Sequence, residues 1–123
     1  MLLLKGNGLV TLISVEVIKK SRDFLKVISN GSRFSINGLI FFYLHHNDSN
    51  FLKIGISVKK KAGNAVVRNK IKRQLRELFK SKSIDMAGLS MVVIVSENGS
   101  AIGSSYKSSS IAIDKFIDFL AKN

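Results

Sequence analysis

Basic residues are concentrated in one segment of the chain and are ordered within it. Between residues 59 and 82, ten of the twenty Lys and Arg residues fall together, and Glu77 is the only acid. Arg68, Lys72 and Arg76 recur at steps of four, so on a helix they form one line. Guanidinium and ammonium groups in such a line bind phosphate oxygens through charge-assisted hydrogen bonds. The segment is therefore a candidate surface for a nucleic-acid backbone.

The same segment predicts the helix that positions these cations. Its apolar residues recur at i, i+4, i+8, i+11 and i+12, which places them on one face of a helix over residues 65–80. They are Val67, Ile71, Leu75, Leu78 and Phe79. We expect this face to be buried against a sheet while the basic face stays accessible.

Charge on the outer face of a helix often serves only solvation, and this alternative has to be weighed. A row that alternates positive and negative side chains would stabilise the helix by about 0.2–0.5 kcal/mol per ion pair. Here the row repels itself, because Glu77 is its only acid. Such a row favours an anionic partner supplied from outside the chain.

Composition supports a nucleic-acid partner. The chain has 123 residues, the size of one domain, and a formal net charge of +12. A hydrophobic fraction of 46% is enough for a packed core. Cysteine is absent, which excludes disulfides and thiolate metal sites. His45 and His46 follow an apolar run, and we interpret them as the end of a strand rather than as metal ligands.

The N-terminal region does not resemble a membrane segment. Lys5 and Glu16 interrupt its apolar runs, and neither run approaches the roughly 20 residues that span a bilayer. We expect a cytoplasmic protein with no membrane partner. Residues 1–18 form a segment of uncertain structure, with a short strand within residues 9–17, and residues 19–123 form a single domain.

The remaining elements are short. A helix is expected at Arg22–Ser29 with Ser21 as its N-cap, strands at Leu39–Leu44, Phe51–Val58 and Leu89–Val95, and a last helix at Ser104–Ala121. The first two strands are predicted to form a hairpin, and a further strand lies within residues 31–37 or in the N-terminal segment. Alternation divides the first strand into Leu39, Phe41 and Tyr43 on one face and Ile40, Phe42 and Leu44 on the other.

This order predicts an α/β (α+β) two-layer sandwich, with a sheet of about four strands and helices on one face. No cluster of carboxylates suited to metal-dependent hydrolysis is evident. Asp114 and Asp118 lie four residues apart on the last helix, and we assign them to its solvated face.

Two motifs resemble the bacterial ribonuclease P protein subunit. The first is GISVKKKAGNAVVRNKIKRQLRELF, in which Gly-Asn-Ala leads to Arg68, Asn69, Lys72, Arg73, Arg76 and Glu77. The second, KKSRDFLKV, includes Lys20 and Phe24 and is similar to the first helix of the family. Both stand in the family's order and spacing, and the resemblance covers about residues 19–120 of the sequence.

The resemblance implies a ribosomal protein S5 domain 2-like fold with a left-handed βαβ crossover around the basic helix. It implies an RNA-binding subunit that assists a catalytic RNA in removing the 5′ leader from precursor tRNA. Its partners would be the ribonuclease P RNA and precursor tRNA, and the free protein would be monomeric. The chemistry would belong to the RNA and to Mg²⁺ held mainly by RNA, with no catalytic residue and no tightly bound metal on the protein.

The resemblance also implies two surfaces. The first contacts the catalytic RNA through the basic helix and the loop before it, at Lys59, Lys60, Lys61, Asn64, Arg68, Asn69, Lys70, Lys72, Arg73 and Arg76. The second is a cleft for single-stranded leader, formed by Lys20, Phe24, Ile28, Phe41 and Tyr43. Aromatic faces beside cations suit unpaired RNA, but core packing is the alternative for Phe24 and Phe41.

Two other functions share some of these features. A small basic ribosomal protein would have the same charge and size and would bind folded ribosomal RNA without a leader cleft. A basic helix lying on an anionic membrane is disfavoured, because the apolar face of this helix is needed for the sheet.

Overall fold

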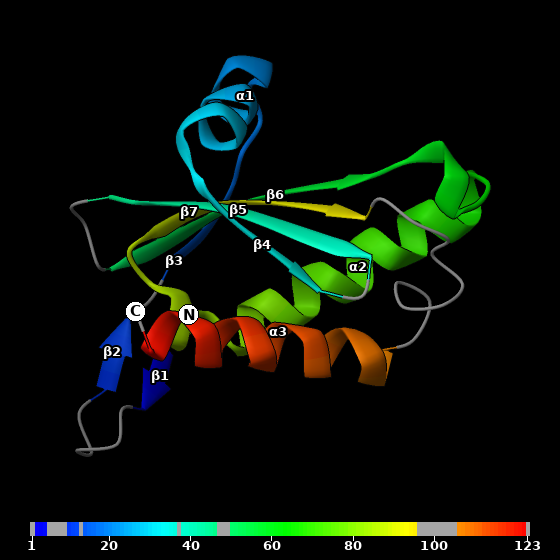
Figure 1. Cartoon of the computed structure of the whole chain (residues 1–123). Coiled ribbons are helices and arrows are strands. Elements are labelled where there is room, and N and C mark those ends of the chain that lie inside the picture. Colours follow the sequence, from blue (N-terminus) through cyan, green and yellow to red (C-terminus); the bar gives the residue numbers. More distant parts are fainter. Residues whose placement is uncertain are drawn as a thin grey trace.

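The computed structural model describes residues 2–4, 10–12, 14–36, 38–46, 50–95 and 106–122. Its strands and helices follow one another in the order shown in Figure 1. They are β1 (Leu2–Leu4), β2 (Val10–Leu12), β3 (Ser14–Val17), α1 (Ser21–Asn30), β4 (Ser32–Ile36), β5 (Leu39–His45), β6 (Phe51–Val58), the 3₁₀ turn η1 (Lys60–Ala62), α2 (Ala65–Ser81), the 3₁₀ turn η2 (Ser83–Met86), β7 (Leu89–Val95) and α3 (Tyr106–Ala121). Within these described ranges, no helix is long and apolar enough to cross a membrane.

Five strands form the main sheet, in the order β3-β6-β7-β5-β4. β7 pairs in parallel with β6 and antiparallel with β5, so it separates these two strands. The predicted β5–β6 hairpin is therefore wrong. The physical reason is the composition of β7, whose Met91, Val92 and Val93 are fully buried and which therefore takes the centre of the sheet.

The α+β class is confirmed, but the layers differ from the prediction. The sheet has five strands, and the helices cover both of its faces rather than one. Figure 1 shows α1 on one side of the sheet and α2 and α3 on the other. The additional strands are β4, within the predicted range 31–37, and β3, which pairs in parallel with the first half of β6. β1 and β2 form a separate two-stranded sheet.

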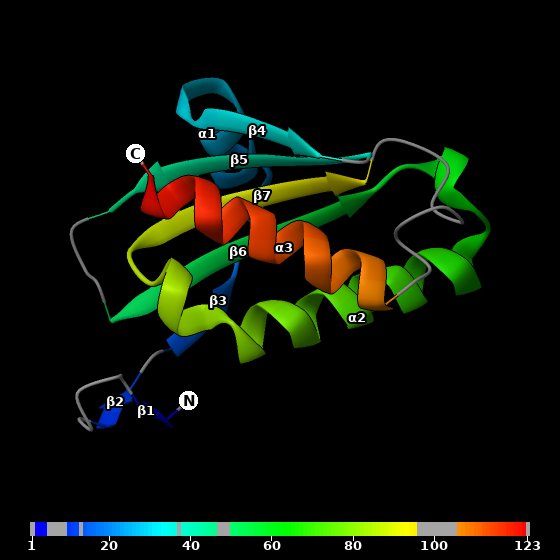
Figure 2. The ribbon, with the colours of Figure 1, turned by 60° about the horizontal axis from the view of Figure 1, so that its bottom comes forward.

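The connection from β6 through α2 to β7 is left-handed, as the family resemblance implied. In Figure 2, α2 lies in front of the sheet, β6 and β7 both run to the right, and β7 lies above β6. Turned so that the strands point upward, the second strand lies to the left of the first. This geometry departs from the right-handed rule for parallel crossovers.

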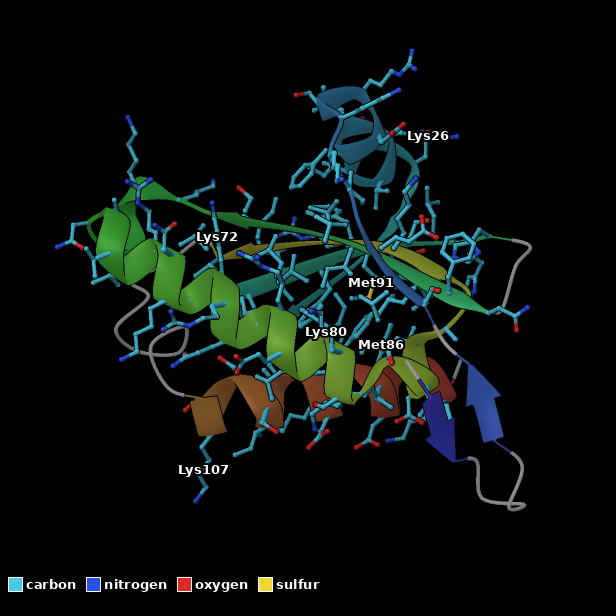
Figure 3. All side chains as sticks on the ribbon, turned by 180° about the vertical axis from the view of Figure 1, so that it is seen from behind. Lys26, Lys72, Lys80, Met86, Met91 and Lys107 are labelled. Atoms are coloured by element: carbon cyan, nitrogen blue, oxygen red, sulfur yellow. The ribbon has the colours of Figure 1, made fainter. Side chains whose placement is uncertain are left out.

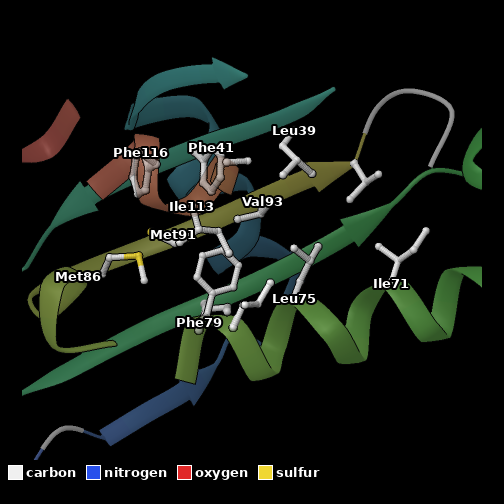
Figure 4. Close-up of a cluster of buried hydrophobic side chains, with 14 of the residues drawn as sticks. Leu39, Phe41, Ile71, Leu75, Phe79, Met86, Met91, Val93, Ile113 and Phe116 are labelled. Carbon is white, nitrogen blue, oxygen red and sulfur yellow. The ribbon is translucent and has the colours of Figure 1, made fainter. Parts of the chain in front are cut away.

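The larger core lies between the sheet and the helices α2 and α3 (Figure 4). The ring of Phe41 is fully buried there and stacks on Phe116, with ring centroids 4.5 Å apart and an interplanar angle of 7°. Phe79 of α2 meets the same ring edge-on at 6.4 Å. One aromatic ring of β5 therefore joins both helices to the sheet.

The periodicity of α2 was predicted correctly. Its Ile71, Leu75, Leu78 and Phe79 are buried, and Val67 packs against the same core. Asn64 is the N-cap, and its side-chain oxygen accepts a hydrogen bond from the Val67 N–H at 3.0 Å. The apolar face is thus occupied by the sheet, which leaves only the polar face for partners.

The boundaries of α1 differ by one residue from the prediction. Helix α1 begins at Ser21, and Lys20 takes the N-cap position in extended conformation without a side-chain cap bond. A smaller apolar cluster joins α1 to its own face of the sheet. Its buried residues are Ile18, Val27 and Val92.

Replacing Phe41 with Ala should test how much of the fold depends on this ring. Because the side chain is fully buried between two helices, we expect a loss of about 3–5 kcal/mol in the free energy of unfolding, measured by denaturant titration. Phe24→Ala is the matched control and should cost less, because the Phe24 ring is only partly buried. Equal losses in the two variants would contradict the assignment of Phe41 to the core.

Candidate nucleic-acid interface

The predicted RNA-binding residues form one continuous surface, which we call the basic ridge. It consists of Lys59, Lys60, Lys61, Asn64, Arg68, Asn69, Lys70, Lys72, Arg73 and Arg76. The three lysines lie at the end of β6 and in η1, all exposed, and the others lie on or next to α2. Arg68 and Lys72 are half-buried at the border with the sheet, while Asn69, Arg73 and Arg76 are exposed. Figure 3 shows Lys72 rising from α2 beside the sheet.

The positive charge of the ridge has no carboxylate partner within the described ranges. The ion pair found there joins Lys82, beyond the ridge, to Asp114 of α3 at 2.5 Å. Asp114 is 58% exposed, in agreement with its assignment to a solvated face. Like charges at neighbouring positions cost stability unless an anion binds them. The ridge is therefore a row of cations that an external anion would stabilise.

Two ridge residues have more specific surroundings. The Nε atom of Arg68 is buried and has no hydrogen-bond partner among the described residues, so an incoming anionic oxygen would satisfy it. Asn64, in contrast, already uses its side-chain oxygen as the cap of α2. Its amide N–H groups remain fully available for a partner.

The predicted leader cleft does not form from the five residues assigned to it. Phe41 and Tyr43 lie on the face of β5 that meets α3, and the Tyr43 ring contacts Phe116 at 5.4 Å. Phe24 and Ile28 lie on α1, against the opposite face of the sheet. The physical reason is the period of two along a strand, which places odd and even residues of β5 on opposite faces.

The aromatic residue of β5 that shares a cluster with Phe24 and Ile28 is Phe42, and Leu44 of the same strand belongs to that cluster too. Phe24, Ile28 and Phe42 are all half-buried and belong to the cluster on the α1 face. Sequence reasoning identified the alternating sets of β5 but assigned the wrong set to this cleft. The helices α2 and α3 need an apolar sheet face to pack on, and the odd-numbered residues of β5 supply it. That requirement leaves the even-numbered residues, Phe42 among them, for the α1 face.

Beyond α1 the same face stays partly open, because α1 is only ten residues long. Ile40, Ile94 and Ser57 are register partners on β5, β7 and β6, and all three are half-buried. They form a row of two isoleucines and one serine that ends beside Lys59. We call this row, together with Phe24, Ile28 and Phe42, the α1-face cleft.

Gly55 sets the position of Phe24 in this cleft. A Cβ atom at residue 55 would lie 2.6 Å from the Cε2 atom of Phe24, so only glycine lets the ring lie directly on β6. The ring is half-buried there, so part of it stays accessible. An accessible aromatic surface is what base stacking uses.

Cations also surround the first turn of α1. Lys20 is exposed and lines a shallow cavity with Lys19, Lys53 and Asp23. A neighbouring cavity of about 230 Å³ is lined by Lys26, Lys53, His45 and His46. His45 is the last residue of β5, as expected, and the His46 ring stacks on Phe51 at 4.1 Å. Nowhere in the described ranges are three potential metal-binding His, Asp or Glu residues grouped together.

Comparison with known proteins agrees with this geometry. The family model for ribonuclease P matches residues 14–114. The ribonuclease P protein component of Mycoplasma mycoides subsp. mycoides SC is 39% identical over 101 residues, which cover 82% of this chain and 92% of that protein.

Solved structures show the same fold. The RNase P protein of Staphylococcus aureus superposes with a TM-score of 0.73 at 27% identity, covering 87% of this chain and 96% of that one. The RNase P protein of Thermotoga maritima gives a TM-score of 0.71 at 25% identity, with 83% and 94% covered. These matches decide against the ribosomal alternative, and the chain belongs to the bacterial ribonuclease P protein family.

Proposed function

We propose that the chain binds the catalytic RNA of ribonuclease P through the basic ridge and the single-stranded 5′ leader of precursor tRNA through the α1-face cleft. The ridge supplies a rigid line of cations for backbone phosphates. The cleft supplies the Phe24 and Phe42 rings and an apolar floor, which suit unstacked bases. Lys59 lies where the two surfaces meet.

The observation that carries this proposal is the continuity of the two surfaces. Phe24 of the cleft lines the same cavity as Lys72 and Arg76 of the ridge. A strand of RNA that leaves the basic ridge can therefore enter the α1-face cleft directly, because residues of both surfaces line this one cavity. Base stacking and phosphate binding are thereby available side by side.

In this proposal the protein does not carry the hydrolysis. Phosphodiester hydrolysis with two metal ions needs clustered acidic ligands, and the described residues do not provide such a set. We assign the Mg²⁺ to the RNA of the holoenzyme. The contribution of the chain is to hold precursor tRNA against the catalytic RNA, in the cytoplasm, as a monomer before assembly.

Arg68→Ala and Arg73→Ala should each weaken assembly with the catalytic RNA by about 1–3 kcal/mol, because each removes a charge-assisted hydrogen bond to phosphate. The slope of log K against log[salt] should become shallower by roughly one for each phosphate that the variant no longer neutralises. Titration of labelled RNA at several salt concentrations measures both quantities.

Lys107→Ala is the matched control for charge. Lys107 is exposed on α3 and points away from the ridge in Figure 3, so its removal should leave the slope nearly unchanged. If all three variants behave alike, general charge rather than the ridge determines the affinity.

Phe42→Ala should weaken the binding of precursor tRNA to the holoenzyme several-fold to about a hundred-fold, because stacking contributes about 1–3 kcal/mol per base. Binding of mature tRNA should change little, since only the precursor carries the leader. Fluorescence titration with both tRNA forms gives the comparison.

Tyr43→Ala is the control on the neighbouring residue. Its side chain lies on the other face of the sheet, so any loss should affect the two tRNA forms equally once the amounts of folded protein are matched. A selective loss of precursor binding in Tyr43→Ala, with none in Phe42→Ala, would place the leader on the α3 face instead.

A further inference from the structure

Helix α1 divides its face of the sheet into two parts (Figure 1). It crosses a middle row formed by Phe42, Val92 and Gly55, which are register partners on β5, β7 and β6. Val92 is fully buried in the cluster with α1, and the Phe24 ring lies on Gly55. The open row of the α1-face cleft lies on one side of this middle row. We call the space on the other side the rear compartment.

The floor of the rear compartment carries polar side chains. Leu44, Ser90 and Lys53 are register partners on β5, β7 and β6, two residues along each strand from the middle row. Because side chains alternate along a strand, these three share the α1 face with the middle row. All three are half-buried and line a cavity of about 230 Å³ beside α1.

The charges around this cavity favour an anion. Lys26 of α1 and Lys53 of β6 both line it, and neither lysine forms an ion pair with a described residue. Asp23 is the only carboxylate among the described residues of the lining. Two ammonium groups therefore face one carboxylate, and the Ser90 hydroxyl adds a further donor.

His46 stands in the cavity wall with its hydrogen bonding incomplete. Its backbone N–H donates to the Gly88 carbonyl at 2.8 Å, and its ring stacks on Phe51 with the centroids 4.1 Å apart. Both ring nitrogens are buried, and neither has a hydrogen-bond partner among the described residues. Buried polar groups normally find a partner in the protein, in water or in a bound ion. An anion in the cavity, directly or through a bridging water, would supply one.

We propose that the rear compartment binds a terminal phosphate group, either free phosphate or a phosphate monoester. The unesterified oxygens of such a group accept several charge-assisted hydrogen bonds at once, here from Lys26, Lys53 and Ser90. Val27 and Leu44, which also line the cavity, would contact an apolar part of the ester. Ligand clefts usually measure about 300–1,000 Å³, so this smaller cavity suits one terminal group.

A metal ion is disfavoured at this place. Lys26 and Lys53 would repel a cation, and the described residues bring no three metal-ligating side chains together. The rear compartment is separate from both surfaces of the proposed function, and the inference can be tested on the free protein.

The first probe is uridine 5′-monophosphate, added at constant ionic strength to the ¹⁵N-labelled full chain. Uridine, which lacks the phosphate, is the matched control. We expect saturable shifts of the Ser90 and Lys53 amide resonances with the monophosphate and none with uridine. If these two amides do not respond, the proposal is wrong, whether or not amides of the basic ridge shift.

Lys26→Ala should weaken this binding about tenfold or more, because it removes a charge-assisted hydrogen bond to the phosphate. Arg22→Ala is the matched control, since Arg22 is exposed on the same helix and does not line the cavity. It should bind nearly as tightly as the unchanged chain. Equal losses in the two variants would overturn the proposal and leave only general charge attraction.

Asp23→Asn should change the affinity in the opposite direction. The variant removes the carboxylate that repels a bound phosphate, so we expect binding to become several-fold tighter. Thermal melts establish that the folded fraction is unchanged. Unaltered or weaker binding in folded Asp23→Asn would contradict the placement of the anion beside this carboxylate.

A short oligouridylate, prepared with a 5′-phosphate and with a 5′-hydroxyl, identifies the source of the phosphate group. A shift of the Ser90 amide with the phosphorylated form alone would assign the compartment to the end of an RNA. A shift with the mononucleotide and with neither oligonucleotide would assign it to a small phosphate compound. Equal shifts with both oligonucleotides would mean that an internal phosphodiester binds there, and the proposal would be wrong.

Discussion

The burial of β7 on both of its faces determines how the rest of this protein is arranged. Met91 and Val93 face the helices α2 and α3, and Val92 faces α1, with all three fully buried. A strand without a polar face is stable only at the centre of a sheet that is covered on both sides. β7 therefore separates β5 from β6, and helices are required on both faces.

The two faces are covered to different extents, and the proposed function depends on that difference. Two long helices close one face around Phe41, Phe79 and Phe116. The short α1 leaves part of the other face accessible, along Ile40, Ile94 and Ser57. The well-packed face provides the stability that lets the other leave apolar side chains accessible, while α2 directs its cations along the sheet edge.

Elements with a strong local pattern could be predicted from the sequence. The strands β6 and β7 and the helix α2 were placed to within a residue, since alternation and helical periodicity are properties of consecutive residues. Strand pairing depends on residues far apart in the chain, so the order of the sheet could not be derived in the same way. The expected hairpin was wrong because β7, more than thirty residues later, pairs with both strands.

The same distinction applies to the candidate site. The residues of the basic ridge can be named from the sequence one by one, because one helix carries most of them, and their role in RNA binding stays a prediction. The cleft combines α1 with three strands, and the alternation of β5 does not show which of its faces meets α1. Only the arrangement of the layers shows that Phe42, and neither Phe41 nor Tyr43, belongs to the cleft. Gly55, on which the Phe24 ring lies, also required the structure.

The central claim is that the leader lies on the α1 face of the sheet and not on the α3 face. The chain has no cysteine, so Phe42→Cys and Tyr43→Cys can each carry one photoreactive group at neighbouring positions on opposite faces. Holoenzyme assembled with 5′-labelled precursor tRNA is irradiated, and the cross-linked nucleotides are mapped. We expect cross-links to leader nucleotides from position 42 and none from position 43. Leader cross-links from position 43, with none from position 42, would contradict this account.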